Sequence, residues 1–149
     1  MTVEQPQKKE EKKLIITREV DYALRILRAL ADGKRVTAKT ICDRELLPLH
    51  FAYRILKKLE KGGLVQIARG ADGGIRLCAD LKSVSMYDLL SMIEENRVIS
   101  ACMQPDFECA WRRDNAGACM VHKQLSEVQR VLDEEFRKRS LEKMLFGER

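Results

Sequence analysis

The sequence predicts a mainly α-helical protein with a small β-hairpin, organised as a winged helix-turn-helix domain plus a long C-terminal dimerisation helix. Three observations favour this class. Hydrophobic stripes at helical spacing come first, a helix with a basic outer face and a glycine-rich hairpin follow, and a long amphipathic segment ends the 149-residue chain. A helix of this kind fits the major groove of DNA. An ordinary helix with a solvated charged face, followed by a hairpin, would show the same features.

The amino-terminal part begins with a polar stretch and continues with two helices. Residues 1–13 are charged and unpatterned, which predicts a disordered arm. A hydrophobic stripe at helical spacing follows Thr17, a potential helix cap, and ends at Gly33. Thr37 is the cap expected for a second, short helix that runs to Arg44.

The strongest pattern lies in residues 46–77. A helix begins near Pro48 and ends at Gly62, and its outer face is polar and mostly basic. Two short alternating segments, 64–67 and 74–77, are predicted as the strands of a β-hairpin around the glycine-rich turn 69–74. The order helix, helix, turn, helix, hairpin predicts a winged helix-turn-helix domain at residues 14–82. The glycines of the turn lack a following helix, which argues against a dinucleotide site.

The charge is unevenly distributed along the chain. The net charge is +5 and the pI about 9.0. Residues 1–82 carry 18 Lys and Arg against 11 Asp and Glu, whereas residues 83–149 carry 10 against 12. The basic half therefore coincides with the presumed DNA-reading half, which favours a polyanionic partner. No segment resembles a transmembrane helix or a signal peptide, so we expect no membrane partner and a cytoplasmic protein.

Residues 83–149 are predicted to form dimerisation helices around a cysteine loop, 97–119. Ser85, with Asp88 three residues on, resembles a capping box and is expected to begin a helix that ends near Asn96. The pattern then breaks, and from about Cys119 one long amphipathic helix is expected to run to the end of the chain. A second copy of the chain is the economical partner for such a helix, so we expect a symmetric homodimer.

Five cysteines in a chain expected in the cytoplasm favour metal or redox chemistry over disulfides. Cys42 and Cys78 each stand alone in apolar surroundings and are interpreted as small core residues. The other three have the spacing C-x6-C-x9-C, and a histidine follows three residues later. The candidate ligands are Cys102, Cys109, Cys119 and His122. The spacing alone suits a metal or cluster site and a set of unrelated thiols equally well.

Four stretches carry a resemblance to a known family: EVDYALRILRALA, ILKKLEKGGLV, RGADGGIRL and the three-cysteine loop before the last helix. The chain resembles the IscR/NsrR/CymR family of bacterial winged-helix regulators, also called the Rrf-two family, over roughly residues 14–132. The resemblance implies a dimeric transcription regulator, mostly of the repressor kind. Many members carry an iron–sulfur cluster on three cysteines, so the resemblance favours a metal site in this loop.

The resemblance offers two choices for a fourth cluster ligand. A histidine three residues after the third cysteine would be His122 and implies a 2Fe–2S cluster, which we favour over 4Fe–4S. An acidic residue in the first helix, reaching across from the partner subunit, would be Asp21. The gap of nine residues between Cys109 and Cys119 exceeds the usual family spacing, and this leaves the cluster type open.

The resemblance also implies DNA contacts from the reading helix and the wing. Arg54 would read a guanine and Arg69 would enter the minor groove, whereas lysines and Arg76 would touch phosphates, although each lysine suits a solvated face equally well. The whole predicted set is His50, Tyr53, Arg54, Lys57, Lys58, Arg69 and Arg76. Tyr53 and Arg54 replace a Glu and a Gln that are frequent in the family, so the operator should differ from that of the biogenesis regulators.

Our leading hypothesis is a homodimeric repressor that binds a double-stranded DNA operator under the control of an iron–sulfur cluster. One alternative is a regulator without a cluster that senses thiol oxidation or a protein partner. Another, of a different class, is a small iron–sulfur carrier, which leaves the wing and the charge distribution unexplained. No constellation of catalytic residues is present and no small-molecule substrate is indicated, so we expect no enzyme.

Overall fold

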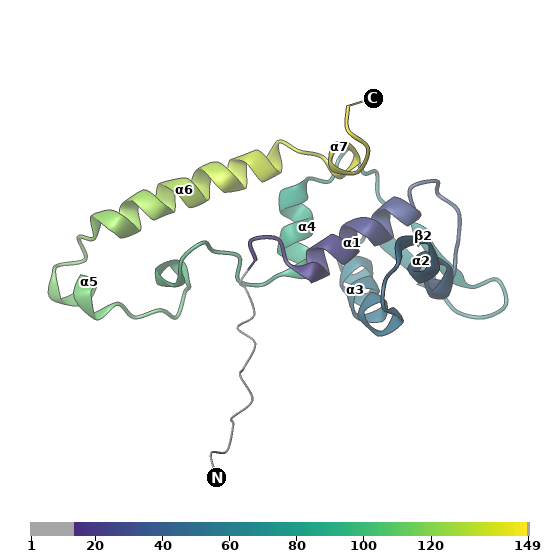
Figure 1. Cartoon of the computed structure of the whole chain (residues 1–149), viewed down its shortest axis with the longest axis horizontal. Helices are drawn as coiled ribbons and strands as arrows, with labels where there is room; N and C mark the ends of the chain where they lie inside the picture. Colours follow the sequence, from purple (N-terminus) through teal and green to yellow (C-terminus); the bar gives the residue numbers. More distant parts are fainter. Residues whose placement is uncertain (1–13, 149) are drawn as a thin grey trace, which may run out of the picture.

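The computed structural model describes residues 14–148; the arm expected at residues 1–13 lies outside them. Figure 1 shows α1 to α4, the hairpin and α7 gathered in one body, from which the segment with α5 and the long helix α6 projects to one side. The elements are α1 (Arg18–Ala29), α2 (Ala38–Glu45), α3 (Leu49–Lys61), β1 (Val65–Ala68), β2 (Gly74–Leu77), α4 (Met86–Ile93), the 3-10 helix η1 (Ala101–Met103), α5 (Ala110–Asp114), α6 (Met120–Arg137) and α7 (Leu141–Phe146).

The first two helices begin differently. Thr37 caps α2 as predicted, because its side chain accepts a hydrogen bond from the Thr40 backbone N–H. Thr17 occupies the corresponding position before α1, but its side chain makes no capping bond. Its hydroxyl instead donates to the Glu94 carboxylate, far along the chain. The predicted cap is therefore wrong, and Thr17 serves a tertiary contact.

A tight turn separates α2 from α3. The Leu47 backbone N–H donates to the Cys42 carbonyl at 3.0 Å, which closes the helix in the manner of a Schellman motif. This closure places Leu46 in the left-handed region, at φ 56° and ψ 50°. Residues with a Cβ adopt this conformation at a cost of roughly 1–2 kcal/mol. Leu46 is thus strained where glycine is the usual residue.

The hairpin follows α3 directly, as predicted. Val65 pairs with Leu77 and Ala68 with Gly74, and Val36 adds an isolated bridge to Ile75. The turn requires glycine at position 73, because a Cβ there would lie 2.6 Å from the Ala68 carbonyl oxygen. The predicted strand at residues 64–67 is displaced by one residue.

The second half of the chain corrects three expectations. The predicted capping box of α4, formed by Ser85 and Asp88, is present, but the helix ends at Ile93 instead of near Asn96. The segment predicted as a loop contains η1 and α5. The last helix does not run to the end of the chain: α6 stops at Arg137, and α7 begins behind a Ser140 cap.

The break before α7 has a tertiary cause. Ser140 forms an isolated β-bridge with Ser85, and the Leu141 backbone N–H donates to the Val84 carbonyl at 2.8 Å. Leu141 is fully buried in the core. The chain therefore turns back to the body after α6, and Leu141 does not extend the apolar face of that helix.

One hydrophobic core joins α1, α2, α3, the hairpin, α4 and α7, and it therefore continues across the expected boundary between residues 82 and 83. Cys42 is buried there as predicted, and burial raises the pKa of its thiol. The prediction for Cys78 is wrong, because this residue is exposed. Side chains alternate along β2, so Ile75 faces the core and Cys78 does not. Within residues 14–148, no helix is long and apolar enough to cross a membrane.

Candidate nucleic-acid interface and metal centre

Helix α3 presents one buried and one exposed face. Ile55, Leu56 and Leu59 pack in the core, and this packing fixes the helix against α1 and α2. The opposite face carries His50, Tyr53, Arg54 and Lys57, all of them exposed. This exposed face brings together the side chains that the sequence assigned to the reading helix, except Lys58, which is half-buried.

A carboxylate from α1 holds two of the cations on α3. Glu19 forms ion pairs with Arg54 and with Lys58, whose Nζ lies 2.9 Å from the second Glu19 oxygen. Lys58 also donates to the Ile93 carbonyl at 2.8 Å. The Arg54 guanidinium lies over the Phe51 ring, 5.3 Å from its centroid. Arg54 is therefore oriented before any contact with DNA, and Lys58 is tied to α1 and α4.

The hairpin exposes two further cations, one in its turn and one on its second strand. Arg69 is exposed directly after β1, at the tip of the wing. Arg76 is exposed on β2, and its Nε donates to the Gln66 side chain at 3.0 Å. Both side chains are accessible, as a wing in contact with a duplex would require.

The cysteine segment brings two predicted ligands into contact. The Cys102 Sγ in η1 lies 3.3 Å from the His122 Nδ1 on α6. Cys119 stands at the N-cap of α6, where its Sγ accepts from the His122 backbone N–H at 3.4 Å. Thiolate and imidazole ligands that share one tetrahedral metal ion lie about 3.5 Å apart, given bond lengths of ~2.3 and ~2.05 Å. The Cys102–His122 pair fits such a site.

The other two candidate ligands are placed apart from this pair. Cys109 stands at the N-cap of α5, half-buried like the other two loop cysteines. Asp21 is paired with Arg25 on α1, at 3.0 Å. Among the described residues, no group of three or more His, Cys, Asp or Glu side chains is assembled around a position for a metal ion. In the described chain, Cys102 and His122 thus lie at a distance that suits two ligands of one metal ion, but the four predicted ligands are not gathered around one position.

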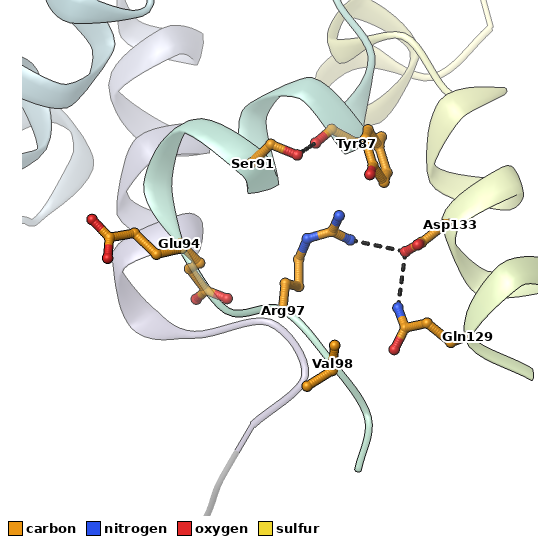
Figure 2. A pocket seen from close by; sticks show the side chains of 8 residues that line it. Tyr87, Ser91, Glu94, Arg97, Val98, Gln129 and Asp133 are labelled. Carbon is orange, nitrogen blue, oxygen red and sulfur yellow. Dashed lines mark hydrogen bonds and ion pairs between the residues drawn. The ribbon is translucent and has the colours of Figure 1, made fainter. Parts of the chain in front are cut away.

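The linker between α4 and η1 is fastened to α6, a feature that the sequence analysis missed. Arg97 forms an ion pair with Asp133 at 3.2 Å, and the Gln129 amide donates to the same Asp133 oxygen at 3.0 Å (Figure 2). Gln129 also accepts from the Ile99 backbone N–H at 2.9 Å. The Arg97 guanidinium lies 4.5 Å from the centroid of the Tyr87 ring. These contacts border a pocket of about 290 Å³ and hold the linker just before Cys102.

A larger, mostly apolar groove of about 1480 Å³ lies between the start of the described chain, α1, the linker and α6. Its apolar lining consists of Leu14, Ile15, Tyr22, Phe51, Val98, Ile99, Leu132 and Phe136. Val121, Val128 and Val131 also stand exposed on α6. An amphipathic helix thus keeps apolar surface that the single chain does not cover.

Comparisons with known proteins agree with this architecture. A family model described as Rrf2, iron-dependent transcriptional regulator, matches residues 16–146. Protein aau3 of Rhizobium meliloti is 27% identical over 95 residues, which are 60% of this chain and 59% of that protein. A putative HTH-type transcriptional regulator of Haemophilus influenzae is 28% identical over 107 residues, 72% of this chain and 65% of the relative. The match thus spans about 60% of the length of these two relatives.

Solved structures show the same fold. The chain is similar to T. potens IscR, with a TM-score of 0.63, 20% identity, and coverage of 91% of this chain and 87% of the other. It is also similar to CymR, the global cysteine regulator of B. subtilis, with a TM-score of 0.61, 24% identity, and coverage of 92% and 100%. At these identities the likeness concerns the winged-helix fold.

Proposed function

The chain belongs to the Rrf2 family of DNA-binding transcriptional regulators, and we propose that it is a homodimeric repressor whose operator affinity depends on an iron–sulfur cluster. The family and the matching relatives are regulators and not enzymes, as the sequence predicted. The observation that carries the cluster part of the proposal is the contact between Cys102 and His122, at 3.3 Å, within a segment that holds two more cysteines. We place the protein in the cytoplasm, where its operator would be.

DNA binding would use the exposed face of α3 and the wing. Tyr53 and Arg54 are exposed on the face that the core leaves free, so they would meet base edges in the major groove. Arg54 carries a planar donor pair that suits a guanine, and Arg69 at the wing tip would enter the minor groove. Lys57 and Arg76 would contact phosphates. Lys58 would do so only after it leaves Glu19.

Dimerisation would cover the apolar surface of α6. Val121, Val128 and Val131 are exposed on this helix, and the apolar groove lies beside it. A second copy of the chain offers a matching helix and a matching groove, as a two-fold interface requires. Two copies would also supply two reading helices for one operator.

Cys102, Cys109, Cys119 and His122 would hold the cluster. His122 already contacts Cys102, whereas Asp21 is engaged with Arg25, and this favours His122 as the fourth ligand. Three thiolates and an imidazole suit a 2Fe–2S cluster, and 4Fe–4S remains the second choice. When bound, a cluster supplies sensitivity to iron supply, oxidants or nitric oxide. Cys109 would have to approach the Cys102–His122 pair, so cluster binding would reorder the segment between them.

The test begins with anaerobic purification, followed by iron and sulfide counts, an absorbance spectrum and the molar mass in solution. We expect a coloured dimer with about two iron and two sulfide per subunit for a 2Fe–2S cluster. Single Cys→Ala variants at 102, 109 and 119 should lose the iron, and His122→Ala should bind it weakly. Cys78→Ala is the matched control, since Cys78 is free, exposed and remote in sequence from the loop. A colourless, iron-free protein after reconstitution would contradict the cluster.

The same samples then test the coupling to DNA. A duplex is selected from a random-sequence library with the cluster-loaded protein, and its affinity is measured for the loaded and the cysteine-substituted protein. We expect a large difference between the two. Equal affinity would instead support the second candidate, a cluster-free regulator. That candidate draws on the three free, half-buried cysteines, which an oxidant could reach.

A further inference from the structure

The turn between α2 and α3 exposes a large apolar side chain. Leu46 is 83% exposed, the highest exposure among the large hydrophobic residues of the described chain. Its backbone is left-handed, at φ 56°, a region that favours glycine and tolerates asparagine. Leucine at this position thus carries two unfavourable features at once, an exposed side chain and a strained backbone.

The Leu46 side chain lies outside the buried core, since the residue is 83% exposed. The turn is closed by backbone groups, through the hydrogen bond from the Leu47 N–H to the Cys42 carbonyl. Leu47, the residue after the left-handed position, is buried in the same core as Cys42, where such a closure usually places an apolar side chain. Glycine or asparagine would form the same turn with less strain. A strained residue that the fold does not require points to a role in function.

The surroundings of Leu46 indicate which function. It lies two residues before Pro48, the N-cap of α3. Leu49 and Tyr53 follow one helical turn apart on α3 and are also exposed, by 40% and 54%. The amino-terminal end of a recognition helix is the part that contacts base edges. The leading end of α3 therefore exposes apolar side chains beside His50, whereas the arginine and lysines lie further along the helix.

We propose that Leu46, which lies beside the exposed Leu49, reads thymine in the operator through apolar contact with the 5-methyl group. Thymine is the base that presents a methyl group in the major groove, and an aliphatic side chain is the group that recognises it. This inference rests on the proposed placement of α3 in the major groove. It adds a specificity-determining position outside the predicted set of polar and aromatic contacts.

The probe for the test is the duplex selected from a random-sequence library with the wild-type protein, together with copies in which deoxyuridine replaces one thymidine at a time. This replacement removes one methyl group and changes no hydrogen-bonding group. We expect a loss of roughly fourfold in affinity at one or two positions per half-site, the amount that corresponds to one buried methyl group. Positions elsewhere in the duplex should be indifferent.

Two variants connect the effect to the residue. Leu46→Asn keeps the left-handed turn and removes the apolar side chain, so it should bind the thymidine duplex more weakly and show no response to deoxyuridine at those positions. Leu46→Met keeps an apolar side chain and should retain the response. The thermal unfolding midpoint of Leu46→Asn should equal or exceed that of the wild type, a result that a structural role for the side chain would not give.

Three results would overturn the inference: a selected half-site without thymine, a deoxyuridine response that persists in Leu46→Asn, or a midpoint that falls together with the affinity. Failure of the proposed function is distinct, because then no duplex would be selected at all. A duplex that is selected but indifferent to deoxyuridine contradicts only the role of Leu46.

Discussion

Replacing Asp133 by Asn tests whether the fastening of the linker to α6 stabilises the protein. The change keeps the side-chain shape and removes the charge that faces Arg97. Exposed ion pairs contribute about 0–1 kcal/mol, and loss of one partner from a fully buried pair costs about 3–5 kcal/mol. The Arg97 and Asp133 side chains are 13% and 19% exposed, and their closest atoms lie 3.2 Å apart. The exposure of this pair lies between the two cases, so we expect Asp133→Asn to lower the free energy of unfolding by about 2 kcal/mol.

Urea unfolding, followed by circular dichroism at one fixed protein concentration, measures this loss. With a slope of about 2 kcal/mol/M, the midpoint of Asp133→Asn should fall by about 1 M. Arg97→Met and the double variant complete a double-mutant cycle. The double variant should lose less free energy of unfolding than the two single variants lose in sum. The matched control is Glu127→Gln on the same helix. Glu127 pairs with Arg130, but both side chains are more than half exposed, so we expect no measurable loss.

The reasoning fails if Asp133→Asn and Glu127→Gln unfold at the same urea concentration. It also fails if the effects of Arg97→Met and Asp133→Asn simply add, because the two side chains would then act independently. In either case the linker before Cys102 would be held by the backbone and by Gln129.

Three further changes test other parts of the structure. Leu141→Ala removes a fully buried side chain and should cost about 3–4 kcal/mol in urea unfolding, whereas Met144→Ala on the same helix, 40% exposed, should cost far less. Gly73→Ala should lower the affinity for the selected duplex about tenfold at little cost in thermal stability, because only the wing turn must shift. Burial raises the pKa of the Cys42 thiol, so a thiol reagent should label Cys78 in the native protein and Cys42 only after unfolding. As pH rises, the Cys42 thiol ionises at lower pH in the unfolded chain than in the folded one. The free energy of unfolding should therefore fall above about pH 8.5, and it should fall less in Cys42→Ala.

Local features of the fold were predictable because short stretches of sequence determine them. Thr37 and the pair Ser85 and Asp88 form caps from neighbours three residues apart, and both caps are present. The glycines of the wing specify a hairpin turn without help from the rest of the chain. The exposed face of α3 follows from the helical spacing of its buried residues, so the exposure of His50, Tyr53, Arg54 and Lys57 was predictable too. Their contacts with DNA stay a prediction.

Features that depend on tertiary contacts could not be predicted from local sequence. Leu141 continues the apolar stripe of α6, so periodicity cannot show that the chain breaks there and returns to the core. Ser140, a residue type that favours helix caps, was the available signal. Thr17 has the residue type of a cap, but Glu94 lies nearby only in the folded chain. The fastening of Arg97 to Asp133 joins residues 36 positions apart and leaves no periodic signal.

In the cysteine segment, too, sequence spacing predicts the candidate residues and the fold decides which of them touch. Spacing alone could nominate Cys102, Cys109, Cys119 and His122 but could not rank them. The fold ranks them, because the 3-10 helix η1 lies against α6 and brings Cys102 to the His122 ring. In the described chain the hydrogen bonds around Cys109 are local: its carbonyl accepts from the Arg113 N–H at 3.1 Å. Within residues 14–148, the contact between Cys102 and His122 is thus the part of the predicted ligand set that the fold brings together.

The described contacts also connect the Cys102–His122 pair with α3, the predicted reading helix. Cys102 contacts α6, which holds the linker through Gln129 and Asp133. The linker begins at Glu94, which accepts from Thr17 at the start of α1. Two residues later on α1, Glu19 holds the Arg54 and Lys58 side chains of α3.

The polar contacts in this series each join two different elements, and short stretches of the chain connect them. Movement of the cysteine segment would therefore act first on the linker and then on α1. A small displacement at Glu19 would redirect Arg54, the residue best suited to read a guanine. Spatial continuity alone does not establish coupling, which requires that a change at one end alters the equilibrium at the other. Asp133→Asn interrupts the series without touching a predicted ligand or a predicted DNA contact. If the series transmits the signal, this variant should bind the cluster normally and lose the difference in operator affinity between its loaded and unloaded forms.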